Sequence, residues 1–290
     1  MSSEALATAP LVAQTIQLSQ DSDELRVLEP RTGWRLLDGK RLWRYREMLY
    51  FLASRDIKVR YRQSVLGAFW AVIQPLGMMI VITFVRSLLG VGSSNDPVLI
   101  FAGLLPWMFF AAAVTNSTNS LVANAGMLRK VYFPRLVLPL SSIGAPLVDL
   151  AVCVAVLAGM MAWFGSPITW TLLLLPAVIA STIIASLGIG VLVSALTVRY
   201  RDFRHVVPFM VQMMFFLTPV MFTTGDLPYP MQWMVGLNPV GGPIEVFRAA
   251  ILGNPIDVNA WMLSTQIALL CLIAGLMYFG RTEKRFADVV

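Results

Sequence analysis

The sequence predicts an all-α integral membrane protein with six transmembrane helices. Apolar residues make up 57% of the chain and charged residues 13%, whereas soluble domains average about 45–50% and about 25%. The apolar residues gather into long stretches, and about 20 residues of helix cross the roughly 30 Å hydrocarbon core. Six such stretches lie near Leu66–Leu89, Leu99–Leu121, Val137–Phe164, Thr171–Val198, Val206–Thr224 and Trp261–Gly280.

The basic residues alternate between the loops and predict the orientation. Of 22 Lys and Arg, all except Arg86 and Arg248 fall in four segments. Because cationic loops stay on the cytoplasmic side, we expect both termini in the cytoplasm and Asn95 and Asp257 outside. The net charge of +6 therefore reports orientation rather than nucleic-acid binding. The four basic segments are Met1–Val65, Val122–Leu136, Arg199–His205 and Arg281–Val290.

The N-terminal part divides into two segments. Residues 1–40 read as an acidic and then basic cytoplasmic tail that is partly disordered. The tail differs from a signal peptide, because its first 25 residues contain acidic residues and no Lys or Arg. Residues 41–63 predict an amphipathic helix on the inner membrane surface, and residues 64–290 form the transmembrane domain. This helix fits a membrane anchor or a lever that contacts a cytoplasmic partner. Its apolar side would hold Leu42, Tyr45, Met48, Leu49 and Leu52.

Polar residues interrupt the predicted spans at three places. Residues 115–120 (TNSTNS) lie within the second span and point to all sides of that helix. They are therefore compatible with both helix packing and cavity lining. Asp149 is about 18 Å deep at 1.5 Å per residue, and it fits either an aqueous path or a buried structural hydrogen bond. Arg86 is about 30 Å from the cytoplasmic end of its span, so we expect it to extend outward to the membrane surface.

The segment Gly225–Ala260 holds five prolines and five glycines among apolar residues. Its apolar runs are too short to cross a bilayer, so they suggest short re-entrant or interfacial helices on the outer side between spans five and six. An ordinary structured loop and a lid over an exit path are both compatible with this pattern.

Several enzyme classes are excluded. The single histidine, His205, falls in a short cytoplasmic loop, so the chain has no HExxH zinc motif. GxSxG and Walker A motifs are also absent. We therefore expect no catalytic residue, no metal site and no bound cofactor. Cys153 and Cys271 fall inside predicted spans and are read as packed thiols.

Six strings along the chain carry a family resemblance. The chain resembles the membrane subunits of type-2 ABC exporters of lipid-linked polysaccharides, such as lipopolysaccharide O-antigen, capsule or teichoic acid. The resemblance covers about Leu49–Val290 and leaves out Met1–Arg46. The strings are RDIKVRYRQSVLGAFWAVIQPL (Arg55–Leu76), FAGLLPWMFF (Phe101–Phe110), KVYFPRLVLPLSS (Lys130–Ser142), RYRDFRHVVPF (Arg199–Phe209), NPVGGPIEVFRAAILG (Asn238–Gly253) and FGRTEKRFADVV (Phe279–Val290).

The resemblance implies partners and roles. Such permeases sit in the bacterial inner membrane as homodimers, with two copies of a separate ATPase subunit that binds ATP and Mg. The segment Arg41–Gln63 corresponds to the interface helix, Asn124–Phe133 to the coupling helix and Leu227–Leu252 to gate helices. The ATPase-coupling residues would be Arg55, Lys58, Arg60, Asn124, Met127, Arg129, Lys130, Tyr132 and Phe133, and the gate residues Trp233, Glu245 and Arg248.

Aromatic and amide side chains predict the substrate channel. Sugar rings have apolar faces beside hydroxyl groups, so aromatic rings near hydrogen-bonding groups suit a glycan, although the same rings also serve packing. We expect a channel for a lipid-linked glycan between two copies of the chain. A drug or small-lipid exporter and a membrane-embedded glycan enzyme or scaffold are the alternatives. The expected channel residues are Trp70, Gln74, Trp107, Phe109, Phe110, Phe215 and Phe216, with Asn116 and Gln212 nearby.

Overall fold

A computed structural model describes residues 39–62, 69–90 and 96–283. This part of the chain is helical and contains no β-strand, and five of its segments are long and apolar enough to cross a membrane. The predicted tail 1–38, the loop around Asn95 and the last seven residues lie outside the described residues. The five segments are α4 (Phe69–Leu88), α5 (Asp96–Ala123), α7–α8 (Val137–Ser141 and Gly144–Phe164), η1–α9 (Trp170–Leu174 and Leu175–Arg199) and α13 (Val258–Thr282).

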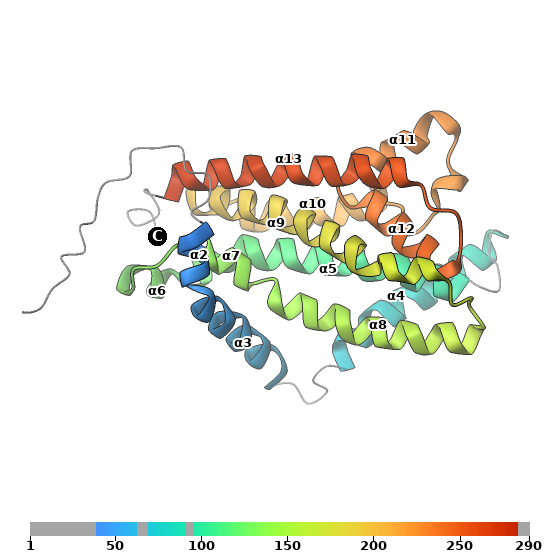
Figure 1. The fold of residues 1–290 in the computed structure, drawn as a ribbon, viewed down its shortest axis with the longest axis horizontal. Coiled ribbons are helices and arrows are strands. Elements are labelled where there is room, and N and C mark those ends of the chain that lie inside the picture. The colour runs from blue at the N-terminus through green and yellow to red at the C-terminus, as the bar shows by residue number, and fades with distance from the viewer. Residues whose placement is uncertain (1–38, 63–68, 91–95, 284–290) are drawn as a thin grey trace, which may run out of the picture. The chain divides into compact units, whose positions relative to one another are not determined.

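Helix α5 is the centre of the bundle (Figure 1). It contacts α4, α8 and α9, the fifth-stretch helix α10 (Phe203–Leu217) and the short helix α12 (Gly241–Leu252). Apolar residues cover all sides of α5, and a helix that is hydrophobic all round is buried. Of an 18-residue apolar stretch of α5, 72% is buried inside the structure, whereas the corresponding share for α4 is 17%.

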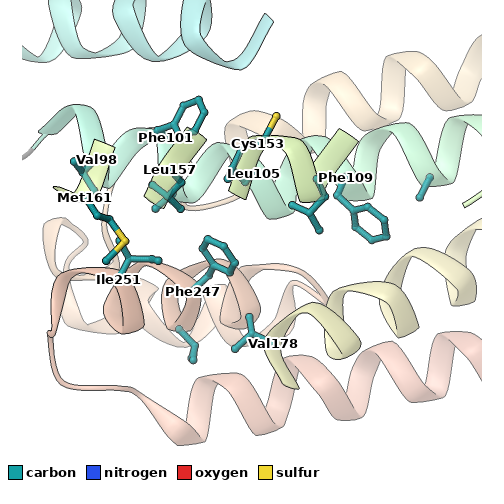
Figure 2. Packing of buried hydrophobic residues seen from close by; sticks show 14 of the residues in the cluster. Val98, Phe101, Leu105, Phe109, Cys153, Leu157, Met161, Val178, Phe247 and Ile251 are labelled. Atoms are coloured by element: carbon teal, nitrogen blue, oxygen red, sulfur yellow. The ribbon is translucent and has the colours of Figure 1, made fainter. Parts of the chain in front are cut away.

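The largest apolar cluster fills the space between α5, α8, α9 and α12. Figure 2 shows Phe101, Leu105 and Phe109 of α5 near Leu157 of α8 and Phe247 of α12. These side chains are 0–3% exposed. Because α12 takes part in this cluster, it is a core element and not a loop lying over the bundle.

Helices α9 and α13 pack at very short distance through two glycines. A Cβ atom built on Gly188 would lie 2.7 Å from the Leu272 backbone nitrogen, and one on Gly275 would lie 2.7 Å from the Gly188 carbonyl oxygen. Small residues allow such an approach, and van der Waals packing then holds the helices together in lipid.

The fifth apolar stretch does not form one continuous helix. Helix α10 has 15 residues and ends at Leu217, so it is about 22 Å long at 1.5 Å per residue. Thr218 precedes Pro219, and a proline disfavours helical backbone in the residue before it. The predicted helix over Val206–Thr224 is therefore wrong beyond Leu217. After it come η2 (Thr224–Asp226), α11 (Tyr229–Leu237) and α12.

The predicted amphipathic helix is two helices, α2 (Gly39–Arg44) and α3 (Arg46–Arg62). Leu52 is 1% exposed and packs in one cluster with Leu42, Tyr45, Met48 and Leu49. Helix α3 contacts α7 and α8. The short helix α6 (Ala125–Lys130) follows α5 and carries Arg129 and Lys130 in its last turn.

Candidate transport site

A cavity of about 590 Å³ lies between α4, α5, α8 and α10, with Arg60 of α3 at its rim. Its lining combines apolar, amide and charged side chains. The expected channel residues Gln74, Trp107, Phe109, Phe215 and Phe216 all line it. The other lining residues are Ala71, Pro75, Met78, Leu105, Met108, Ala111, Ala112, Thr115, Asn116, Pro146, Asp149, Leu150, Cys153, Pro208, Val211 and Gln212.

Four aromatic rings form a connected row from α5 to α10. The Trp107 ring centroid is 5.6 Å from that of Phe110 and 5.7 Å from that of Phe215. Phe215 and Phe216 follow at 5.5 Å in an edge-to-face arrangement. Phe110 is 1% exposed and packs behind the cavity, while Trp70 is 56% exposed and lies outside it. The structure therefore places five of the seven expected residues at the cavity.

The polar residues 115–120 of α5 fall into two groups. Some form hydrogen bonds within the helix bundle, and the others line the cavity. Thr118, Asn119 and Ser120 donate to backbone carbonyls within α5. Ser117 donates to the Pro139 carbonyl at the contact with α7. Thr115 and Asn116 line the cavity, although Thr115 also donates to a backbone carbonyl.

An ion pair joins α3 to α8 at the cavity rim. Arg60 Nη2 lies 2.7 Å from Asp149 Oδ2, and the Tyr61 hydroxyl donates to Asp149 Oδ1. Burial and the Asp149 carboxylate raise the pKa of the Tyr61 phenol, so this group stays a donor at neutral pH. The sequence suggested either a structural hydrogen bond or an aqueous path for Asp149. In the structure its carboxylate is hydrogen-bonded and also lines the cavity.

Helix α3 also contacts the turn before α6. Arg55 Nη2 donates to Asn124 Oδ1 at 3.0 Å, which links the two segments expected to couple to an ATPase. Tyr132 is 72% exposed, whereas Phe133 is 4% exposed and packs in the core below α3. A groove of about 560 Å³ runs along the outer side of α3 and is lined by Phe51, Ser54, Arg55, Lys58, Val59 and Arg62.

At the α11 end, two arginines hold the irregular segment that follows α10. Arg86 Nη1 donates to the Met221 carbonyl at 3.1 Å. Arg248 donates to the carbonyls of Val220 and Phe222, the latter at 2.8 Å. Three consecutive carbonyl groups therefore bond to guanidinium groups. Non-helical backbone at membrane depth requires such buried partners.

Arg86 differs from the sequence expectation in its surroundings, and Arg248 is also enclosed. Arg86 does not extend to the surface, as its side chain is 14% exposed and its Nε lies 2.8 Å from Asp96 Oδ2. Arg248 is 2% exposed. Its Nε donates to the Leu99 carbonyl at 3.1 Å, and its Nη1 lies 3.6 Å from Glu245 Oε1.

Of the expected gate residues, Glu245 and Arg248 are held inside the structure, and Trp233 on α11 is 59% exposed. Glu245 Oε1 accepts a bond from the Thr224 backbone nitrogen at 3.0 Å. Glu245 and Arg248 thus fix the segment between α10 and α11, whereas the Trp233 ring is exposed on α11.

Residues 47–252 match the family described as ABC-2 type transporter. This chain belongs to that family. The matched part begins in α3 and runs through α12, so it contains the cavity and both arginine sites of this ABC-2 family chain.

The ABC-2 family chain also has relatives with export functions in their names. It is 27% identical over 246 residues to the O-antigen export system permease protein RfbA of Klebsiella pneumoniae, covering 84% of this chain and 95% of the relative. It is 26% identical over 255 residues to RfbA of Myxococcus xanthus, covering 87% and 98%. The polysialic acid transport protein KpsM of Escherichia coli is 24% identical over 251 residues, covering 80% and 92%.

Sequence reasoning missed three partners in this chain, namely Asp96 for Arg86 and both Arg60 and Tyr61 for Asp149. Asp96 is the partner of Arg86, and the signal was its place at the start of the next span, close in sequence to Arg86. Tyr61 is the second partner of Asp149. These two residues are 88 positions apart, and periodicity within either helix cannot show that they meet.

Proposed function

We propose that this chain is the membrane-spanning permease subunit of an ATP-driven exporter that moves lipid-linked polysaccharide across the bacterial inner membrane. The names of the relatives support the cargo class, and the alignment with the Klebsiella relative covers 95% of its length. The cavity is the observation that supports the proposal, because its lining includes the aromatic rings of Trp107 and Phe216 and the amides of Asn116 and Gln212. Such a lining suits sugar rings, whose apolar faces stack and whose hydroxyls form hydrogen bonds.

The subunit pairs with a second copy of itself to complete the channel. Helices α4 and α10 border the cavity and carry large exposed apolar side chains, among them Phe84, Phe209 and Phe216. Lipid surrounds part of this apolar surface, and the second copy covers the rest. In this arrangement α4 and α10 supply the channel walls, as the resemblance implies for the first and fifth spans.

A separate ATPase subunit drives the cycle and binds ATP and Mg. It would contact the outer side of α3 and the exposed residues of α6, including Arg129 and Lys130. The hydrogen bond from Arg55 to Asn124 joins these two contact regions. Movement of either region therefore acts on α3, and the Arg60–Asp149 pair carries it to the cavity rim.

Both termini and α6 lie on the cytoplasmic side in this proposal, and α11 and α12 lie in the outer leaflet. Helix α10 and the irregular segment after it make the fifth crossing. Trp163, Trp170 and Trp233 support this placement, since they are 87%, 76% and 59% exposed and tryptophan gathers at membrane surfaces. An impermeant thiol reagent added outside should label Asn259→Cys and spare Arg201→Cys, in a background without Cys153 and Cys271. The reverse labelling would overturn the orientation.

Deletion of the gene in the organism that encodes this chain tests the function. The mutant should lose a surface polysaccharide and accumulate the lipid-linked polymer inside, and the unmodified gene should restore export. Deletion of the partner ATPase gene should give the same phenotype. A mutant with unchanged surface polysaccharide would refute the proposal.

A matched pair of aromatic substitutions tests the site. Phe216→Ala removes a cavity ring that is 58% exposed, while Phe110→Ala removes a packed ring that is 1% exposed. Phe216→Ala should reduce export at normal membrane abundance, and Phe216→Tyr should restore it because a flat ring remains. Phe110→Ala should lower abundance, since it leaves a core cavity that costs about 3–5 kcal/mol. Equal loss of abundance in both variants would assign Phe216 to packing.

Export of a drug or small lipid is the second candidate function. The cavity volume of about 590 Å³ falls within the range of roughly 300–1,000 Å³ found for small-molecule sites. In that case the deletion mutant would keep its surface polysaccharide and become sensitive to an apolar toxic compound.

A further inference from the structure

Three side-chain amides face the cavity from three different helices. Gln74 comes from α4, Asn116 from α5 and Gln212 from α10. Among the residues that the structure describes, none forms a hydrogen bond with these amides. Asn119 in the same α5 turn shows the contrast, since its amide donates to the Thr115 carbonyl at 3.0 Å. An amide offers two donor hydrogens and one acceptor oxygen, so the three groups can bond a ligand that both donates and accepts.

Two of the amides have an apolar or aromatic neighbour on their own helix face. Residues three and four apart are neighbours on a helix surface, so Gln212 lies beside Phe215 and Phe216, and Gln74 lies beside Met78. All of these residues line the cavity. A ligand that contacts either of these two amides therefore also meets an apolar surface.

The charges of the lining cancel. Arg60 and Asp149 are the charged residues among those that line the cavity in the described part of the chain, and they pair at 2.7 Å. Asp149 also accepts the Tyr61 hydrogen bond. Arg60 is thus the only cation in the lining that the structure describes, and it already pairs with Asp149, so a carboxylate-bearing polymer would meet no cation without a carboxylate partner.

We infer that the polymer carried by this exporter is an uncharged glycan whose hydroxyl groups are bound by Gln74, Asn116 and Gln212. This inference rests on the proposed function and deepens it by naming the class of sugar. A sugar hydroxyl donates one hydrogen and accepts others, which matches an amide. A repeat that carries a uronic acid, a sialic acid or a phosphate does not match this lining.

The polymer itself provides the first test. Sugar and phosphate analysis of the surface polysaccharide that disappears in the deletion mutant should find only neutral sugars in its repeat. An acidic sugar or a phosphate in every repeat would overturn the inference and leave the proposed function standing. A mutant that loses no surface polysaccharide would overturn both.

Variants of Gln212 provide the second test, with export and membrane abundance both measured. Gln212→Leu should lower export of the native polymer about three- to tenfold, the effect of losing one or two hydrogen bonds, at unchanged abundance. Met213→Leu is the matched control on the same helix, because Met213 does not line the cavity, and it should export normally. Gln74→Leu repeats the test on α4. Normal export by both leucine variants at Gln74 and Gln212 would overturn the assignment.

The Gln212→Glu variant distinguishes a neutral polymer from an anionic one. The carboxylate keeps acceptor oxygens for hydroxyl groups, so export of a neutral glycan should exceed that of the Gln212→Leu variant. The added negative charge would repel an anionic polymer. Export below the Gln212→Leu level, at equal abundance, would overturn the inference.

Discussion

Arg60 near α3 and Arg248 near α11 differ in how exposed their guanidinium groups are and in which groups they bind. The Arg60 side chain is 42% exposed and pairs with one carboxylate, while the Arg248 side chain is 3% exposed. Arg248 donates to backbone carbonyls of α5 and of the segment after α10. A part-exposed pair contributes little free energy and can open easily, whereas a buried guanidinium that loses its partners is strongly unfavourable. We therefore expect the α3 end to adjust more readily than the α11 end.

Replacement of Arg248 should have the largest effect. Arg248→Met keeps the side-chain length but leaves the carbonyls of Leu99, Val220 and Phe222 without their guanidinium partner. We expect a loss of about 3–5 kcal/mol, seen as a sharp fall in membrane abundance and thermal stability. Arg204→Met, at an exposed position at the start of α10, is the control and should leave abundance unchanged. Normal abundance of Arg248→Met would remove the distinction between the two ends.

Phe133 and Tyr132 form a neighbouring pair that tests the α3 end. Phe133→Ala should cost about 3–5 kcal/mol, because Phe133 is 4% exposed. Tyr132 is 72% exposed, so Tyr132→Ala should keep abundance and assembly but separate the partner's ATP hydrolysis from export. The ratio of hydrolysis to export, measured in membranes that contain both subunits, checks this. An unchanged ratio would place the coupling contact elsewhere.

Gly103 tests how tightly Arg248 is enclosed. A Cβ atom at Gly103 would overlap the Arg248 guanidinium, so Gly103→Ala must move that group and should cost about 1–3 kcal/mol. Gly159→Ala on α8 is the matched control, because nothing lies within 4 Å of its Cβ position. It should be neutral or stabilise the helix by up to about 1 kcal/mol. Equal melting temperatures for the two variants would contradict a rigid α11 end.

Tyr61→Phe should have the smallest effect on stability. The variant loses one hydrogen bond to Asp149, which contributes about 0.5–1.5 kcal/mol. Because the folded protein raises the pKa of Tyr61, this contribution is fully present below the ordinary tyrosine pKa of about 10 and is lost at higher pH. Melting temperatures of the two proteins should therefore converge in alkali. A difference that grows with pH would contradict the assigned bond.

Length and apolar content were sufficient to predict the helices, but not where each helix ends. Five spans follow from stretches of 20 residues or more. The fifth stretch was read as one helix through Thr224 because its composition stays apolar, although Pro219 marks the break. Apolar content reports burial and says little about backbone hydrogen bonds. Arginines from α4 and α12 supply those bonds, and only the folded chain brings them together.

The candidate site was predicted in part for a similar reason. Aromatic residues were chosen by type and position, and of these Trp107 and Phe215 line the cavity. Trp70 and Phe110 have the same chemistry, yet they lie outside it. Which side of a helix faces the cavity depends on how α4 and α5 rotate against their neighbours, and a stretch that is apolar all round does not encode that rotation.

The close contact of α9 and α13 has a consequence for engineering the cargo. In the part of the chain that the structure describes, neither helix contributes a residue to the cavity. The Gly188 and Gly275 contact can therefore remain untouched while α4 and α10 are redesigned for another polymer. Directed libraries confined to Gln74, Gln212 and Phe216 would explore new cargo without disturbing the part of the scaffold that tolerates change least.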